Sequence, residues 1–241
     1  MKLLFVHARA ETRELARYPA FIVPTLTFPS LLMLLYGFTT LHVPRQALMV
    51  SFAGFAVLAV SFFQFGVGIA VERTSQWHLF LRTLPAPPRI RLGARLVSAL
   101  VVGAAAASVV VVAALASGAP ALPGIQWLRL VTVLIAGSVP FALLGVGMGY
   151  SLPARGALPV ANILYLALAY LGGLWGPVHL VHGLDAVARL LPTRAWGDLL
   201  TAVASGAPWQ LRPWVTLGIY TIVFAAFAAF AYRNDEGERF N

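Results

Sequence analysis

The sequence has 241 residues, of which 60% are hydrophobic and only 10% are charged, and its formal net charge is +9. A water-soluble domain usually carries about a quarter charged residues, because its surface must be solvated. The composition therefore excludes an ordinary soluble domain and predicts that lipid surrounds most of the chain. The chain has no cysteine, which excludes disulfides and cysteine-ligated metal sites.

The first 18 residues are predicted to form an amphipathic helix that lies on the membrane surface. At 100° per residue, the basic side chains Lys2, Arg9, Arg13 and Arg17 fall on one side of such a helix. The opposite side carries Leu4, Ala8 and Leu15. This separation favours a position at the water–lipid boundary. The alternative is a positively charged flank that only precedes the first membrane span.

Six stretches are long and apolar enough to cross a membrane, which takes about 20 residues as a helix. The predicted spans are Phe21–Leu41, Leu48–Val71, Gly93–Ala116, Leu128–Tyr150, Ala157–Trp175 and Trp214–Tyr232. Glycines at 66, 68, 145, 147 and 149 are expected to allow close helix approach, because small residues let helix backbones come together. The fold class is therefore an all-α polytopic membrane protein.

The segment 176–213, before the sixth span, is predicted to be an outer re-entrant segment. It contains two helical stretches, Val178–Leu191 and Ala195–Val203, which Pro192 separates. Both are too short to span the bilayer, so we expect two short re-entrant or interfacial helices. Asp185 and Arg189 are spaced for an ion pair within the first of them.

The distribution of basic residues predicts the orientation. With the N-terminus inside, 12 of the 17 lysines and arginines fall on the cytoplasmic side, as the positive-inside rule requires. Five of the six tryptophans then lie at or beyond the outer ends of spans. We expect a multi-pass protein of the plasma (inner) membrane with both termini in the cytoplasm. The positive charge follows this membrane rule, so it does not indicate a nucleic-acid partner.

The sequence lacks the residues for ATP hydrolysis, metal-dependent catalysis and ion-coupled transport. Lys2 is the only lysine, so the chain has no phosphate-binding loop and is not expected to hydrolyse ATP by itself. The sequence has no HExxH motif, no histidine inside a span and no predicted metal site. The spans hold essentially no ionisable residue, and Glu72 lies at the very end of the second one, which argues against ion-coupled transport. A transporter built this way takes its energy from another protein.

The cytoplasmic loop 72–92 is the most informative segment. After the charge pair Glu72-Arg73 it continues as an amphipathic helix that the prolines from Pro85 onward end. The apolar side chains at helical spacing are Trp77, Phe80, Leu81 and Leu84. A short helix of this kind is suited to docking in a groove of a cytoplasmic partner. The alternative is an interfacial helix that only anchors the second and third spans.

This pattern resembles the membrane subunits of ABC-2 type exporters. The features that carry the resemblance are Glu72-Arg73, the string Leu81-Arg82-Thr83-Leu84-Pro85 and the re-entry Gly93-Ala94-Arg95. The order of elements resembles that family over almost the whole chain, and residues 72–96 are its specific part. Two features depart from the family pattern: Thr74-Ser75-Gln76-Trp77 replaces a stretch that often reads x-x-Gly-Thr, and Arg95 stands where lysine is common.

The resemblance implies one transmembrane domain over residues 1–241 that pairs with a second copy or a homologue. It also implies a separate P-loop ATPase subunit that binds ATP and magnesium, while this chain binds no cofactor. The ATPase would be coupled through Glu72, Arg73, Trp77, Phe80, Leu81, Arg82, Leu84 and Pro85. The connecting helix would contribute Arg9, Arg13 and Arg17, and these arginines with Glu72 and Arg73 would form a charge relay.

The resemblance also places a cargo cavity between the second and fifth spans. Its candidate residues are Phe62, Phe63, Gln64, Asn162, Tyr165 and Tyr170. For Gln64 and Asn162 the alternative is a hydrogen bond between helices, worth about 1 kcal/mol, and for the aromatic residues it is packing. Their apolar character favours export of a hydrophobic or amphiphilic compound such as a drug, an antibiotic or a lipid-like molecule. Export of a polysaccharide is the alternative that the sequence does not exclude.

Two other functional classes remain. The first is a scaffold or assembly factor without transport activity that docks a cytoplasmic partner through residues 72–92. The second is a membrane-embedded enzyme, which the missing catalytic motifs disfavour.

Overall fold

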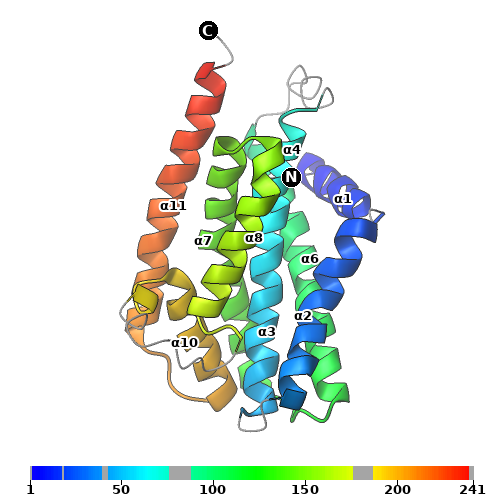
Figure 1. The fold of residues 1–241 in the computed structure, drawn as a ribbon, viewed down its shortest axis with the longest axis vertical. Helices are drawn as coiled ribbons and strands as arrows, with labels where there is room; N and C mark the ends of the chain where they lie inside the picture. The colour runs from blue at the N-terminus through cyan, green and yellow to red at the C-terminus, as the bar shows by residue number, and fades with distance from the viewer. Residues whose placement is uncertain (1, 18, 40–42, 76–87, 176–186, 239–241) are drawn as a thin grey trace.

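The computed structural model describes residues 2–17, 19–39, 43–75, 88–175 and 187–238, which form helices and turns and no β-strand. Figure 1 shows these helices packed as an upright bundle, with one helix lying across it. In chain order they are α1 (Lys2–Ala16), α2 (Pro19–Thr39), α3 (Arg45–Val60), the π-helix η1 (Ser61–Val67), α4 (Gly68–Glu72), α6 (Pro88–Ala116), α7 (Gly124–Ser151), α8 (Ala154–Leu171), α10 (Pro192–Ser205) and α11 (Leu211–Glu238).

The six predicted spans are confirmed, and with them the all-α polytopic membrane fold. Helices long and apolar enough to cross a membrane cover Ile22–Thr39, Arg45–Glu72, Gly93–Ala116, Gly124–Ser151, Ala154–Leu171 and Leu211–Asp235. The structure extends the fourth span by four residues at its start, because Pro123 precedes the first turn and Gly124 begins it. The amphipathic N-terminal helix is present as α1.

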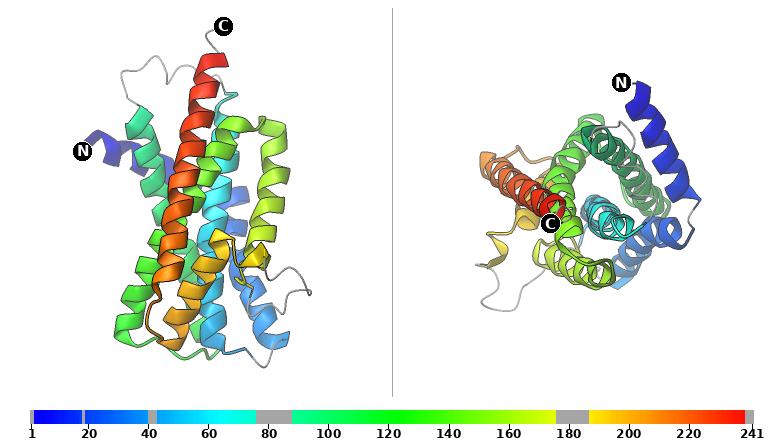
Figure 2. Two further views of the ribbon diagram at one scale, coloured as in Figure 1. Left: turned by 90° about the vertical axis from the view of Figure 1, so that its left-hand side faces the viewer. Right: turned by 90° about the horizontal axis from the view of Figure 1, so that it is seen from above.

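The second span forms the centre of the bundle. Helices α3, η1 and α4 run end to end from Arg45 to Glu72, and 78% of the residues in their most apolar stretch are buried, against 17% in α11. Seen along the bundle axis in Figure 2, α3 is surrounded by the other helices. The most apolar span is α6, yet only 39% of it is buried. Hydropathy does not distinguish a span buried inside the protein from a span that faces lipid, because lipid and a protein interior both accept apolar side chains.

The segment of this span that follows α3 is a π-helix of seven residues, in which Phe62 and Gln64 are buried. Pi-helical turns inside longer helices are rare and often mark functional sites. Helix α7 approaches this segment closely: a Cβ atom at Gly145 would lie 2.6 Å from the Ser61 carbonyl oxygen, and one at Gly149 would lie 2.7 Å from that of Phe65. The predicted close approach of helices at these glycines is therefore confirmed.

The second short helix of the outer segment is present as α10, but it begins at Pro192 and not at Ala195. Proline is favourable in the first helical turn, where its missing N–H has no helical partner to lose. The predicted start at Ala195 was therefore wrong, and the separation of two helices by Pro192 stays a prediction. Most of the first stretch, including Asp185 of the expected ion pair with Arg189, lies outside the described residues.

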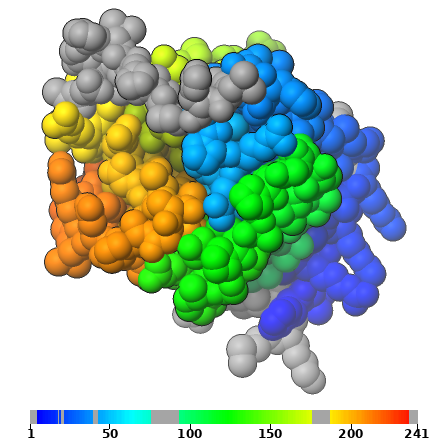
Figure 3. Space-filling view, turned by 90° about the horizontal axis from the view of Figure 1, so that it is seen from below, coloured from blue at the N-terminus to red at the C-terminus, as the bar shows by residue number. Residues whose placement is uncertain are grey.

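The bundle has two distinct ends. We call the end that carries α1, the end of α4, the start of α6 and the C-terminal part of α11 the basic end. Helix α1 lies there nearly perpendicular to the spans (Figure 2). At the opposite end, the start of α3, the α6–α7 connection and α10 with the start of α11 lie next to one another (Figure 3).

Candidate functional site

Helix α1 packs on α6 through one face and exposes the other. Ala8 is buried, and Leu15 packs against the apolar cluster that includes Val60 and Ala99. The side chains of Arg9, Arg13 and Arg17 are exposed. The predicted amphipathic helix is thus found, with its arginines on the surface away from α6.

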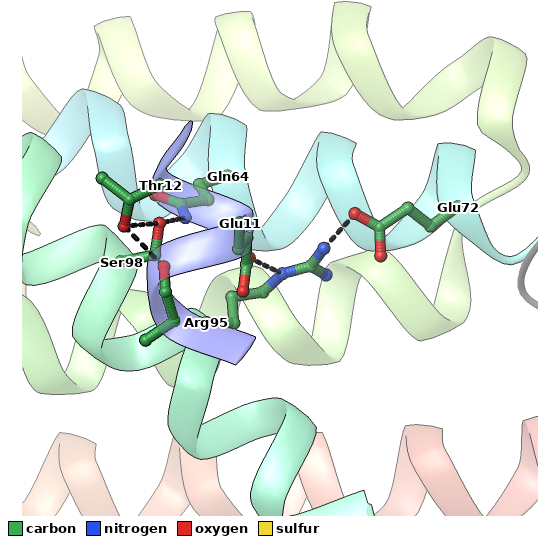
Figure 4. Close-up of polar contacts among 7 residues, drawn as sticks. Glu11, Thr12, Gln64, Glu72, Arg95 and Ser98 are labelled. Carbon is green, nitrogen blue, oxygen red and sulfur yellow. Dashed lines mark hydrogen bonds and ion pairs between the residues drawn. The ribbon is translucent and has the colours of Figure 1, made fainter. Parts of the chain in front are cut away.

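One arginine joins three helices at the basic end. The Arg95 Nε atom of α6 donates to Glu11 Oε1 of α1 at 2.9 Å, and its Nη2 atom contacts Glu72 Oε1 at the end of α4. Figure 4 shows the guanidinium between the two carboxylates. Only 12% of the Arg95 side chain is exposed. The planar guanidinium can donate to two acids at once, which a lysine ammonium does less well.

A second set of polar contacts, next to this arginine along α1 and α6, reaches the π-helix. Ser98, one turn further along α6, is fully buried and its Oγ lies 3.1 Å from Thr12 Oγ1 of α1. The Gln64 amide nitrogen of η1 donates to the same Ser98 Oγ at 3.2 Å. Gln64 Oε1 is buried and has no hydrogen-bond partner among the described residues. Polar contacts therefore reach from α1 across α6 to the centre of the bundle (Figure 4).

Arg73 ties the end of α4 to two other helices. Its Nη1 atom lies 2.8 Å from Asp235 Oδ1 of α11 and also donates to the Tyr150 carbonyl oxygen at the end of α7. Its carbon Cζ lies 5.9 Å from the centre of the Tyr150 ring. Both charged side chains are largely buried. The structure therefore pairs the charges differently from the expected relay, since Glu72 contacts Arg95 and Arg73 contacts Asp235.

The predicted cargo residues separate into two groups. Gln64 faces α6 through Ser98, whereas Phe63 and Tyr165 face each other with ring centres 5.6 Å apart. Tyr165 also stacks on Phe55 at 4.7 Å. Phe62 is buried, Asn162 is half-buried and Tyr170 is exposed. A role of these residues in cargo binding stays a prediction, and Phe63 with Tyr165 is the pair that the fold brings together.

The aromatic pair belongs to a larger cluster between α2, α3 and α8. Its rings contact one another edge to face, tilted or stacked, and its members are Tyr36, Phe52, Phe55, Phe63, Tyr165, Tyr170 and Trp175. The Tyr165 hydroxyl and the Trp175 indole nitrogen are buried without a hydrogen-bond partner among the described residues. We call these seven residues the aromatic cluster.

Sequence reasoning missed the roles of Glu11, Ser98 and Asp235. The available signals were Glu11, an acid inside a basic helix, and Asp235, an acid at the end of a span. Neither signal indicates which residue the acid contacts. Among the predicted coupling residues, Trp77, Phe80, Leu81, Arg82, Leu84 and Pro85 lie outside the described residues. In the described part of the chain, no three acidic or histidine residues are grouped closely enough to hold a metal ion.

Comparison with known proteins places this geometry in context. No protein-family model matches the chain. The chain is 24% identical over 245 residues to a protein of Bacillus subtilis (strain 168) described as "Putative transport permease YvfS", and the alignment covers 98% of this chain and 99% of that protein. The match therefore includes α1, the central helix and α11. The chain is thus similar from end to end to a protein described as a transport permease, which is consistent with the resemblance to ABC-2 type permeases carried by residues 72–96.

Proposed function

We propose that this chain is the transmembrane permease subunit of an ATP-driven ABC-2 type exporter, which moves a hydrophobic or amphiphilic compound out of the cytoplasm or the inner leaflet. A separate P-loop ATPase, with its ATP and magnesium, supplies the energy through residues 72–85 and α1. The basic end then faces the cytoplasm with both termini, in keeping with the positive-inside rule.

The observation that carries the proposal is the polar path from the basic end to the π-helix. Arg95 contacts Glu72, the last residue of α4 before the loop expected to dock the ATPase, and it contacts Glu11 of α1. Ser98 then connects α1 and α6 to Gln64 in the most buried helix. A displacement of the loop or of α1 would therefore act on the centre of the bundle through a few exchangeable polar contacts.

The aromatic cluster supports the apolar cargo. Phe63 and Tyr165 lie between the π-helix and α8, and their neighbours are aromatic. In the most apolar stretches of α2 and α8 beside them, only 22% of the residues are buried. These helices leave large apolar side chains exposed, among them Leu31, Phe38 and Ile163. A second copy of the chain packing on these faces would cover them and would enclose a pathway lined by the aromatic cluster.

The first test is co-purification and ATPase activity. The chain is expressed together with a candidate P-loop ATPase subunit and reconstituted in lipid. We expect the two to co-purify, Leu84→Arg to abolish the complex, and Arg95→Gln to keep the complex but remove most of the stimulation of ATPase activity by cargo. The exposed Arg194 of α10 provides the control, and Arg194→Gln should leave both unchanged.

The alternative function, a scaffold without transport activity, predicts a different result. A scaffold that docks a partner through residues 72–92 would bind its partner without any stimulated ATPase activity. Failure of the ATPase to bind, together with indifference to Leu84→Arg, would overturn the transporter proposal.

The cargo is tested with a panel of apolar and amphiphilic compounds. We expect Phe63→Ala to weaken stimulation by the active compound at least about tenfold, which corresponds to the loss of roughly 1.4 kcal/mol of binding free energy. Leu158→Ala, an exposed position near the start of α8, is the matched control. Unchanged stimulation in Phe63→Ala would remove this residue from the cargo pathway while leaving the coupling through Arg95 intact.

A further inference from the structure

The backbone hydrogen bonds of the second span change from one spacing to another and back. The Ser61 N–H, at the end of α3, donates to a carbonyl oxygen four residues earlier, as in an α-helix. The Gly68 N–H donates to the Phe63 carbonyl oxygen, five residues earlier. The Arg73 N–H, after α4, donates again to a carbonyl oxygen four residues earlier. The π-helix η1 is therefore an insertion between two α-helical segments.

This insertion determines the direction in which the side chains of α4 point. A turn closed by five-residue hydrogen bonds holds about one residue more than a turn closed by four-residue bonds. If η1 became α-helical, its seven residues would describe a larger angle, and α4 would turn by about 100° relative to α3. Each residue of α4 would then point in the direction of the residue that now follows it.

Helix α4, and not α3, is the part that can turn. Every residue of α3 from Leu48 to Val60 is buried, and the surrounding helices hold it on all sides (Figure 2). In α4 only Ile69 and Ala70 are buried, and the helix has five residues. A turn of α3 would disrupt the centre of the bundle, whereas a turn of α4 changes only the basic end.

The packing around η1 offers little resistance to such a turn. Gly66 and Gly68 have no side chains that would have to move past a neighbour, and a Cβ atom at either would lie 3.6 Å or more from the nearest atom. On the facing helix α7, the closest residues are Gly145 and Gly149. In η1 itself, the buried Gln64 Oε1 has no hydrogen-bond partner among the described residues. The present arrangement therefore leaves one polar group of η1 unsatisfied.

The apolar residues of α4 fit both arrangements about equally well. Gly68, Ile69, Ala70 and Val71 follow one another without a polar side chain. After a turn of one residue, Ile69 would take the buried position of Ala70, and Ala70 would take the position of Val71, which is 51% exposed. Only a methyl group would lose its burial, so apolar packing does not decide between the two arrangements.

The charged residues at the end of α4 do decide. In the structure Glu72 contacts Arg95, and Arg73 contacts Asp235; Figure 4 shows the first pair. After the turn, Glu72 would point towards Asp235, and Arg95 would keep only its contact with Glu11. Two carboxylates that share a site repel each other, and a buried charge that loses its partner is unfavourable. The two ion pairs therefore hold η1 in its π-helical form.

We propose that η1 is a switch with two states. In the state of this structure, the ion pairs Glu72–Arg95 and Arg73–Asp235 hold it as a π-helix. In the second state η1 is α-helical, and α4 is turned by one residue with Arg73 released to the surface. The proposal rests on the hydrogen bonds and ion pairs of this chain and not on the transport proposal.

The test uses cysteine accessibility, because the chain has no cysteine of its own. Ile69→Cys, Ala70→Cys and Val71→Cys are made separately, and each full chain in lipid nanodiscs reacts with a small membrane-permeant maleimide. In the π-helical state Val71→Cys should react readily, and the other two should be protected. After the turn only Ala70→Cys changes, since the positions of Ile69 and Val71 are then still buried and exposed, respectively.

Asp235→Arg shifts the balance towards the second state. The introduced guanidinium repels Arg73 in the present arrangement and attracts Glu72 after the turn. We expect the labelling rate of Ala70→Cys to rise at least about tenfold, and those of Ile69→Cys and Val71→Cys to stay the same. The matched control is Asn234→Arg, a change at the exposed neighbouring residue of α11, which should leave all three rates unchanged. Elution volume first shows that each variant is folded.

A deletion gives an independent readout. Removing Val67 takes the additional residue out of η1, so the segment should become α-helical while α3 and α4 keep their present directions and both ion pairs. This protein should fold, and in it Asp235→Arg should no longer expose Ala70→Cys. Removing Ala56 from α3 is the control, because α3 has no additional residue, and this deletion should prevent folding.

Three results would overturn the proposal. The first is an equal rise at all three cysteines in Asp235→Arg, which indicates local unfolding and not a turn. The second is an unchanged rate at Ala70→Cys, or the same rise in Asn234→Arg. The third is a Val67 deletion that disrupts folding as much as the Ala56 deletion. None of these measurements involves an ATPase, so the switch and the transport proposal fail separately.

Discussion

The two ends of the bundle are held together by different kinds of contact. At the basic end, ion pairs connect separate helices: Arg95 joins α6 to α1 and α4, and Arg73 joins α4 to α11. At the opposite end, Arg45 and Arg129 donate to the carbonyl oxygens of Ser117 and Ala207, and a close fit of small and large side chains joins α10 to α7. The Trp196 ring of α10 is fully buried against Gly137 of α7, and its indole nitrogen donates to the Val133 carbonyl oxygen at 2.9 Å.

This difference indicates which end can change shape. Ion pairs and hydrogen bonds keep part of their strength when helices shift, because charged side chains are long and can exchange partners. Packing of a ring against a glycine has one geometry and is lost when the helices move apart. We therefore expect the opposite end to be the more rigid part of the bundle and the basic end to shift more easily.

The largest effect is expected at the fixed end, from Gly137→Val. A Cβ atom at this position would lie 2.0 Å from the Trp196 indole nitrogen, so the ring must leave its site and lose its hydrogen bond. We expect a loss of stability of about 4 kcal/mol or more. The unfolding temperature in detergent measures it.

The control for this change is Gly218→Ala in α11, where a Cβ atom would meet nothing within 4 Å. Stability should stay the same or rise by up to about 1 kcal/mol, since alanine is the better helix former. A Gly137→Val protein as stable as the Gly218→Ala protein would contradict a rigid opposite end.

A smaller effect is expected from Arg95→Ala at the basic end. The change leaves Glu11 and Glu72 without their cation, and removing one partner of a buried ion pair costs about 3–5 kcal/mol. Because Glu72 is more than half exposed, we expect the lower limit of this range. Arg95→Lys should recover part of the loss. Additive effects of Arg95→Ala and Glu11→Gln in a double-mutant cycle would show that the pair contributes nothing.

Asp235→Asn tests the second ion pair with a change of charge and almost none of size. We expect a loss of about 1–2 kcal/mol, because the hydrogen bond to Arg73 remains while its charge assistance is lost. For a protein of this length that lowers the unfolding temperature by roughly 3–6 °C. The effect should be smaller in the Arg73→Gln background. An equal loss of stability in both backgrounds would show that the contact between Asp235 and Arg73 does not stabilise the protein.

The smallest effect is expected from Arg194→Ala in α10. Arg194 and Asp198 form an exposed ion pair within one helix, at 3.2 Å. Pairs of this kind contribute at most about 0.5 kcal/mol and are screened by salt. The unfolding temperature should therefore hardly change. A loss comparable to that of Arg95→Ala would show that the distinction between pairs within a helix and pairs between helices is wrong.

Much of the fold followed from local features of the sequence. Each span is an uninterrupted apolar run of sufficient length, and α1 separates basic from apolar side chains with the period of one helix. Pro192 marked the start of α10, although the helix was expected to begin three residues later. The glycines of α7 indicated close packing before any partner helix was known.

The partners within the candidate site could not be predicted in the same way. Arg73 and Asp235 are 162 residues apart, and Gln64 and Ser98 are 34 apart. The order of charges along the chain favoured a pair of Glu72 with Arg73 because they are neighbours, but adjacent residues on a helix point in directions about 100° apart. That rotation sends Glu72 towards α6 and Arg73 towards α11.

The sequence alone determined that this protein crosses the membrane as six helices with a surface helix in front, because the length and polarity of each segment decide whether lipid or water surrounds it. Only the tertiary structure decided that the second span is the buried one, that it contains a π-helix, and that Arg95 joins it to α1. Lipid and protein interior are equally apolar, so the choice between them is made by the shapes of the packed helices, in which Gly145 and Gly149 let α7 lie against the central helix.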